Sequence, residues 1–325
     1  MTSSSSRLFG IIALLIVAAI AFGTWLNLPT TRYQSYVGQY EKIFLEKGPV
    51  DVLVMGTSAT QTVMDPELLA RLLKQKLDRD VVIYDFSKSW RGDDFTYVAL
   101  RDFFKQGRNA KQILIEYRWN GGDSHDHFYR VARFDDIVLG AIHKDGYPWA
   151  FRLQDVLALS VAKSSFYLST LLLGDWVEMP KGPPLQATTS MMRPNDAVSS
   201  NLVTDEINLH AEEYKTAPDR VWDWQSDIEE RNRYLHGKIL SMAKAAGADI
   251  TFFELPLIYR TPMDTEMVKG ISTLYGVPLI TKTRKQMEVI FPKGYTDHGH
   301  YTDFGRQKYM EWFAEYLAPK LRRHD

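Results

Sequence analysis

Short apolar runs alternate along the chain with longer segments in which apolar residues recur every three or four positions. Residues 50–55 form the first run, and the segment after residue 65 places its leucines on one stripe of a helix. The same two patterns predict further strands at residues 81–84, 112–116, 250–254 and 277–280, and further helices at residues 95–105, 227–246, 265–275 and 303–317. This alternation predicts an α/β fold of three layers, in which helices flank a parallel sheet and ligands collect at the carboxyl ends of the strands.

Several residues suggest where the helices begin and end. Asp65 suits the N-cap of the first helix and Pro66 its first position. Residues 56–64, between the first strand and this helix, are expected to form a loop. The last helix is expected to end before Pro319, because proline cannot donate the hydrogen bond of a helix interior.

The N-terminal segment is predicted to be a membrane anchor. Residues 8–26 contain no charged residue, and roughly 20 apolar residues cross the hydrocarbon core of a bilayer as a helix. Arg7 precedes the segment, so residues 1–7 are expected in the cytoplasm and the domain after the inner-membrane anchor in the periplasm. A signal peptide cleaved near the small residues 19–21 is the alternative. Both interpretations place the folded part outside the cytoplasm.

The chain beyond the anchor divides into three parts. Residues 27–49 are expected to connect the anchor to an α/β domain made of residues 50–120 and 227–325. Between the two halves of this domain, residues 121–226 lose the strand–helix alternation and are expected to form helices and loops. An insertion near the strand ends is typical of a lid or a partner-binding surface.

Composition narrows the classes of function. The chain has 325 residues, of which 45% are hydrophobic, and this is enough for one large core. Its 39 basic and 40 acidic residues are nearly balanced, which argues against a nucleic-acid partner. The absence of cysteine excludes disulfides, thiolate metal sites and a cysteine nucleophile, and it fits an oxidising compartment. No cofactor is predicted. The acidic and histidine residues at 123–127 match no metal-site spacing and are interpreted as a polar loop.

Two segments at opposite ends of the α/β pattern carry candidate chemistry. Ser58 lies just past the first strand, and Asp297 precedes His300 by three residues in a loop that enters the last helix. A serine hydroxyl becomes a good nucleophile when an imidazole takes its proton and a carboxylate orients that imidazole. The chain order Ser, Asp, His is one in which this triad occurs. Taken singly, the two segments also suit an ordinary turn and a helix-capping loop.

The blocks Gly56-Thr57-Ser58 and Asp297-x-x-His300 resemble those of the SGNH (GDSL-type) hydrolase superfamily. The resemblance covers residues 51–120 and 250–321. It is greatest to membrane-anchored branches that act in cell-envelope acylation, such as the alginate acetylation and teichoic-acid D-alanylation proteins. It implies that Ser58 is the nucleophile, with Asp297 and His300 as its triad partners, on a flavodoxin-like sheet.

The same resemblance implies an oxyanion hole made of the Ser58 backbone N–H, Gly92 and Asn120. Gly92 and Asn120 follow the second and third strands, where they also suit ordinary turns. Four further residues near the strand ends are candidates for the pocket lining: Thr57, Trp90, Arg91 and Arg118. The alternative for the tryptophan is packing on the core, and for the arginines a place on the surface.

These observations predict an extracytoplasmic serine esterase or O-acyltransferase that works through acyl-Ser58. The resemblance implies that it moves acetyl or a similar small acyl group to or from a cell-envelope polysaccharide or exopolysaccharide. A membrane-bound O-acyltransferase that supplies the acyl group is the partner implied. Two alternatives remain: a catalytically weak scaffold of the same fold that binds a polysaccharide or membrane partner, and a lipase.

Overall fold

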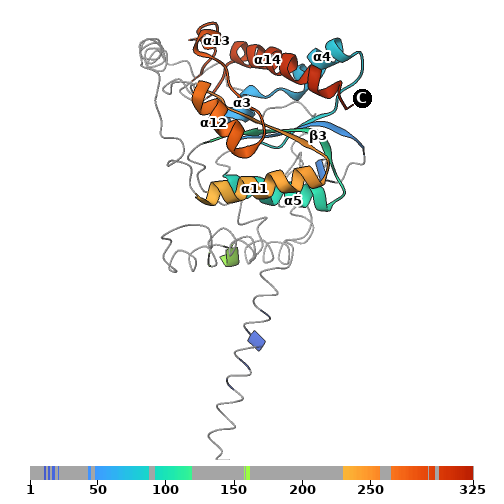
Figure 1. Cartoon of the computed structure of the whole chain (residues 1–325), viewed down its shortest axis with the longest axis vertical. Helices are drawn as coiled ribbons and strands as arrows, with labels where there is room; N and C mark the ends of the chain where they lie inside the picture. The colour runs from blue at the N-terminus through green and yellow to red at the C-terminus, as the bar shows by residue number, and fades with distance from the viewer. Residues whose placement is uncertain are drawn as a thin grey trace, which may run out of the picture.

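The core of the protein is a five-stranded parallel sheet with helices on both faces (Figure 1). The computed structural model describes residues 11, 14, 17–18, 21, 43–44, 48–87, 92–118, 157, 159–161, 230–256, 265–291, 293–296 and 300–324. The strands are β1 (Val50–Met55), β2 (Ile83–Asp85), β3 (Ala110–Glu116), β4 (Asp249–Phe253) and β5 (Leu279–Ile280), in the spatial order β2-β1-β3-β4-β5. This α/β sheet is consistent with a flavodoxin-like or SGNH-type fold.

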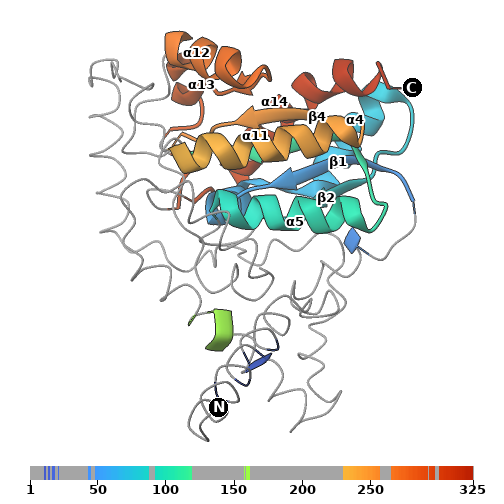
Figure 2. The same ribbon diagram turned by 60° about the horizontal axis from the view of Figure 1, so that its bottom comes forward.

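Helices of both halves of the chain cover the sheet. They are α3 (Ser58–Val63), α4 (Pro66–Leu77), α5 (Asp93–Lys105), α11 (Glu230–Ala245), α12 (Thr265–Tyr275), α13 (Arg284–Glu288) and α14 (Asp303–Leu321). Helices α5 and α11 lie side by side on one face, as Figure 2 shows, while α4 and α14 cover the other face. Because the central strands are covered on both faces, their apolar runs need no polar alternation, and all six residues of β1 are buried.

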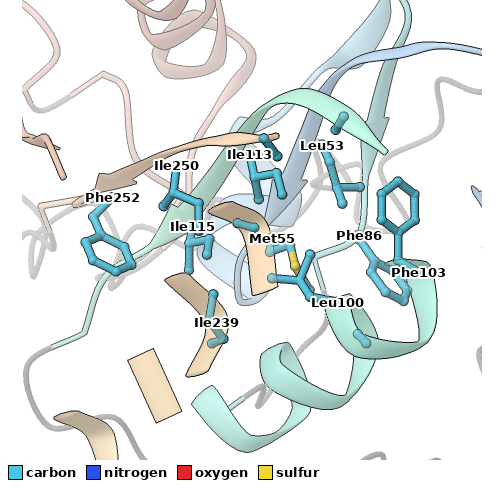
Figure 3. Packing of buried hydrophobic residues seen from close by; sticks show 14 of the residues in the cluster. Leu53, Met55, Phe86, Leu100, Phe103, Ile113, Ile115, Ile239, Ile250 and Phe252 are labelled. Atoms are coloured by element: carbon cyan, nitrogen blue, oxygen red, sulfur yellow. The ribbon is translucent and has the colours of Figure 1, made fainter. Parts of the chain in front are cut away.

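Successive side chains of β1 from Val52 to Met55 enter opposite hydrophobic cores. Leu53 and Met55 of β1 point to the α5–α11 face, where they pack with residues of β3 and α5 such as Ile113 and Phe103 (Figure 3). Val52 and Val54 point to the other face, toward α3, α4 and α14. Because side chains alternate between the two faces of a strand, the one sheet contributes residues to a hydrophobic cluster on each of its faces.

Most predicted elements are present, and their boundaries shift by a few residues. The first strand and the helix at residues 265–275 match the prediction, and Asp65 accepts a hydrogen bond from the Leu68 N–H as the N-cap of α4. The strand predicted at residues 81–84 is shorter and later, at Ile83–Asp85. The strand predicted at residues 277–280 is reduced to Leu279–Ile280.

Two expectations were wrong. Residues 56–64 are not a loop throughout, because Ser58–Val63 form α3. Pro319 does not lie beyond the last helix, because α14 continues through it to Leu321, whose side chain is fully buried. Proline is tolerated there since it stands in the last turn, where burial of the following leucine favours continuing the helix.

Most of the predicted N-terminal anchor lies outside the described residues. Within residues 8–26, only positions 11, 14, 17–18 and 21 are described, and they are helical with exposed side chains. Among the described residues, no helix is both long and apolar enough to cross a membrane. The anchor at residues 8–26 stays a prediction, as do the connector and insertion boundaries.

Two glycines bring the segment before α14 against the start of that helix. A Cβ added at Gly305 would lie 2.2 Å from the backbone oxygen of Gly294, far inside van der Waals contact. The Thr302 N–H donates to the same Gly294 oxygen at 2.9 Å. The loop of residues 294–305, which contains His300, is therefore closed by a backbone contact that only glycine allows.

We expect Gly305→Ala to lower the free energy of unfolding by about 2 kcal/mol or more, because the backbone must move to admit the methyl group. Urea unfolding followed by circular dichroism measures this change. Gly237→Ala in α11 is the control: a Cβ there meets nothing within 4 Å, so helix propensity should leave stability equal or raise it by up to about 1 kcal/mol. Equal effects of the two substitutions would contradict the proposed close contact.

Candidate active site

Ser58 lies where sheet topology predicts a ligand site. It is the first residue of α3, directly beyond β1, and its side chain is partly exposed. The strand order places β2 on one side of β1 and β3 on the other, so the chain reverses its direction of winding between β1 and β3. Ligands of open parallel sheets bind at such a switch point, outside the carboxyl ends of the strands.

A buried carboxylate fixes the turn that carries Ser58. Glu116, the last residue of β3, is only 4% exposed. Its Oε2 accepts a hydrogen bond from the Thr57 backbone N–H at 2.7 Å and from the Thr60 hydroxyl at 2.5 Å. The Thr57 hydroxyl lies within 2.9 and 3.0 Å of the two carboxylate oxygens. Thus Thr57 does not cap α3 with its side chain but attaches the turn to the neighbouring strand.

Arg118 completes this network from the solvent side. Its Nε donates to Glu116 Oε1 at 2.9 Å, and its Nη2 donates to the Thr57 hydroxyl oxygen at 2.7 Å. The two charged side chains differ in exposure, because the arginine side chain is 42% exposed and the carboxylate is almost wholly buried. The predicted pocket residues Thr57 and Arg118 are therefore in contact, beside Ser58.

Glycine is required at the start of the turn. A Cβ on Gly56 would lie 2.0 Å from the hydroxyl oxygen of Thr60, which is hydrogen-bonded to Glu116. A larger residue would displace either Thr60 or the turn. The glycine of the Gly56-Thr57-Ser58 block is thus explained by close packing against the first turn of α3.

The loop after β2 reaches the same edge of the sheet. Gly92 is the buried N-cap of α5, and its carbonyl accepts from the Thr96 N–H at 3.3 Å. The side-chain amide of Gln61 in α3 donates to the Ser87 carbonyl at 2.9 Å, which joins α3 to this loop. Trp90 and Arg91 lie outside the described residues, so their assignment to the pocket stays a prediction.

The segment that contains His300 is attached to the helix that begins at Ser58. The Tyr301 N–H donates to the Thr62 hydroxyl at 3.3 Å, and Arg306 Nε donates to the Thr62 carbonyl at 3.0 Å. Because Thr62 follows Ser58 by four residues, the two lie on the same side of α3. The His300 side chain itself is partly exposed. Asp297 and Asn120 lie outside the described residues, so the triad carboxylate and the third oxyanion donor stay predictions.

A second polar cluster is buried on the opposite face of the sheet. His236 Nε2 lies 3.2 Å from the Asp93 carboxylate, and His236 Nδ1 lies 3.1 Å from the Tyr275 hydroxyl. Burial raises the pKa of the Tyr117 and Tyr275 hydroxyls, so both are neutral at physiological pH. The cluster joins α5, α11 and α12 in the core.

Lys282 is a buried cation just beyond β5. It is 6% exposed, and its ammonium nitrogen lies 5.1 Å from the Tyr309 ring centroid and 4.9 Å from that of Trp312. Burial lowers the pKa of Lys282 from 10.5 to about 8; Lys308 also lowers it, whereas Glu311 opposes the shift. The two rings favour the charged form, since a cation over an aromatic face is attracted to it.

Sequence reasoning missed Glu116 and His236. The signal for Glu116 was an acidic residue at the end of an otherwise apolar strand, the position that faces a ligand edge in a parallel sheet. His236 carried no comparable signal, because a single histidine in a helical pattern has many explanations. Residues 123–127 lie outside the described part of the chain. Within that part, no three His, Asp or Glu side chains are placed to hold a metal ion.

Comparison with known proteins adds no relative. No protein-family model matches the chain, and no curated protein is significantly similar to it.

Glu116→Gln tests the role of the buried carboxylate. The glutamine amide has no negative charge to pair with Arg118. It also has only one accepting oxygen, so its NH₂ group faces donors such as the Thr57 N–H. We therefore expect the free energy of unfolding to fall by about 2–4 kcal/mol. Glu315→Gln is the matched control, because Glu315 pairs with Lys76 at the surface and its side chain is 72% exposed. That change should stay within about 0.5 kcal/mol. If Glu116→Gln were as stable as the wild type, the hydrogen bonds of Glu116 would not stabilise the turn.

The Lys282 pKa predicts a pH dependence of stability. Its folded-state pKa of about 8 lies below the ordinary value of 10.5, so between these values the unfolded state binds more protons. Stability should then rise with pH across this window relative to Lys282→Met, which has no group to titrate. Urea unfolding of both proteins at several pH values measures this difference. The difference between the wild type and the surface substitution Lys269→Met should show no such trend, because the Lys269 side chain is 67% exposed. A pH dependence that is the same in the wild type and in Lys282→Met would contradict the lowered pKa of Lys282.

Proposed function

We propose that the protein is a serine esterase or O-acyltransferase that forms an acyl-Ser58 intermediate. The observation that carries this proposal is the position of Ser58: it begins a helix at the β1/β3 switch point, on a turn that Glu116 holds by hydrogen bonds. A nucleophile needs a fixed position relative to its base and to the oxyanion donors, and such a turn supplies it.

The geometry supports His300 as the base. Its loop is attached through Tyr301 to Thr62, on the side of α3 that also bears Ser58. In the proposed reaction, His300 takes the proton of the Ser58 hydroxyl as its oxygen attacks the carbonyl carbon of an ester. Asp297 orients the imidazole and stabilises its charged form.

The remaining steps follow from this attack. The tetrahedral oxyanion is stabilised by the Ser58 N–H, with the Gly92 N–H and the Asn120 side chain as further donors. His300 then gives its proton to the leaving alcohol, which departs and leaves acyl-Ser58. Water attacks this ester to release the acid, or a sugar hydroxyl attacks it to give a new ester, and Ser58 regains its proton in either case.

The proposed substrate is an acetyl or similar small acyl ester on an envelope polysaccharide or exopolysaccharide. Two sequence features support this choice: the predicted anchor at residues 8–26, which would hold the domain in the periplasm at the inner membrane, and the resemblance to membrane-anchored acylation proteins. A membrane-bound O-acyltransferase is the proposed acyl source. The chemistry needs no cofactor.

Hydrolysis of 4-nitrophenyl acetate by the full chain in detergent tests the proposal. We expect Ser58→Ala and His300→Ala to lower kcat at least about 10³-fold, because nucleophile and base act as a unit. Mass spectrometry of the rapidly acid-quenched reaction should find acetyl on Ser58. Ser241→Ala in α11 and His324→Ala, whose histidine pairs with Asp249 near the start of β4, are the controls and should retain activity.

Two results would contradict the proposal. One is turnover that survives Ser58→Ala, which would place the chemistry elsewhere. The other is a folded protein without turnover or adduct, whose cellular role also tolerates Ser58→Ala. That combination would favour the scaffold alternative, in which the fold binds a polysaccharide or membrane partner without reacting.

A further inference from the structure

Two tyrosine hydroxyls meet at one carbonyl oxygen next to the segment that contains His300. The Tyr295 hydroxyl and the Tyr301 hydroxyl each donate to the Pro256 carbonyl at 2.7 Å. A carbonyl oxygen has two lone pairs, so it can accept both bonds. Pro256 lies three residues beyond the end of β4. The two tyrosines therefore attach the segment that contains His300 to the chain that leaves the carboxyl end of β4.

Both tyrosines belong to the hydrophobic cluster on the α4–α14 face of the sheet. Tyr301 is fully buried, and Tyr295 is 4% exposed. Burial raises the pKa of the Tyr301 hydroxyl well above its ordinary value of 10.0, so this group keeps its proton and remains a donor at physiological pH. A buried hydroxyl left without an acceptor costs about 1–3 kcal/mol. The Pro256 carbonyl thus restricts where each ring can lie.

The same two tyrosines flank His300 in the chain. Tyr295 and Tyr301 form an antiparallel bridge, and their ring centroids are 4.6 Å apart. Between them, the Thr296 N–H donates to the His300 carbonyl at 3.0 Å. Because His300 directly precedes Tyr301, the bond from Thr296 and the attachment of Tyr301 together fix the backbone of His300.

Tyr301 also contacts the helix that begins at Ser58. Its N–H donates to the Thr62 hydroxyl at 3.3 Å, and Thr62 lies about one turn beyond Ser58 in α3. Its ring meets the Tyr309 ring of α14 edge to face, with the centroids 5.0 Å apart. One residue thus joins the chain after β4, the helix of the proposed nucleophile and the last helix.

We infer that Tyr301 is a positioning residue for the proposed base, His300. The bond of its hydroxyl to Pro256 keeps the imidazole within reach of Ser58, and Tyr295 supports this arrangement through the shared carbonyl. This inference rests on the proposed function, in which His300 takes the Ser58 proton and returns it to the leaving group. A misplacement of about 1 Å can cost about 100-fold in rate. Phenylalanine would fill the same space, so the hydroxyl contributes the fixed position.

Leaving-group dependence tests this inference on the full chain in detergent. 4-Nitrophenyl acetate and phenyl acetate carry the same acyl group, but phenolate is the more basic leaving group and depends more on the proton from His300. We expect Tyr301→Phe to lower kcat/KM by about 10- to 100-fold for phenyl acetate, and by a factor about 3-fold smaller or less for 4-nitrophenyl acetate. Tyr295→Phe should shift the ratio of the two values in the same direction.

This ratio separates positioning from stability. A variant that is merely less stable contains less folded enzyme, which lowers both kcat/KM values equally and leaves their ratio unchanged. Tyr316→Phe is the matched control, because it also removes a tyrosine hydroxyl from α14 that contacts the sheet: the Tyr316 hydroxyl lies 3.3 Å from that of Thr251 in β4. Tyr316 is about 20 Å along α14 from the start of the helix. Its substitution should keep the ratio of the wild type.

The outcomes distinguish this inference from the proposed function. An unchanged ratio in Tyr301→Phe, or an equal shift in Tyr316→Phe, would overturn the positioning role and leave the esterase intact. If Tyr301→Phe does not fold, the ratio in Tyr295→Phe decides in the same way. Absence of turnover that depends on Ser58 with both esters would overturn the proposed function, and with it the assignment of His300 as a base.

Discussion

The Glu116 carboxylate is the constraint on which the candidate site depends. Burying an ionised carboxylate is costly unless hydrogen bonds and an opposite charge replace its water. Here Thr57 and Thr60 supply three donors from the turn after β1, and Arg118 supplies the charge from the chain after β3. The turn and the carboxylate therefore require each other, and moving either leaves polar groups buried without partners. The nucleophile candidate is thereby fixed to the centre of the sheet.

Much of the fold could be predicted because burial on both faces gives each central strand a continuous apolar run. The runs of β1 and β3 were clear for that reason, and the leucine stripe of α4 followed from its packing on one face. Elements held by tertiary contacts were harder. Ser58–Val63 has little helical pattern, and α3 is held by bonds from Thr60 to Glu116 and between Thr62 and the segment before α14. No local property of these residues reveals such long-range partners.

Candidate site residues could be predicted only where residue type and order along the chain indicate a known kind of chemistry. Ser58 beyond β1 and His300 before α14 could be picked out because serine, histidine and strand ends form a known combination. The network beneath them could not, since Glu116 is indistinguishable in sequence from any acidic residue that ends a strand. The pairing of Glu116 with Thr57 depends on the adjacency of β1 and β3, which is a property of the sheet order rather than of either segment.

The ion pair of Glu116 and Arg118 is buried at the carboxylate and partly exposed at the guanidinium. Apolar residues of equal volume often stabilise a protein as well as a buried ionic group does, so stability alone does not explain the buried carboxylate. An apolar replacement would, however, leave the Thr57 N–H without an acceptor and would put no charge beside Ser58. The pair provides two groups in fixed positions. The Glu116 carboxylate accepts hydrogen bonds from the turn, and the Arg118 guanidinium lies on the solvent side of the turn. The same hydrogen bonds thus hold the turn and place the guanidinium on its solvent side.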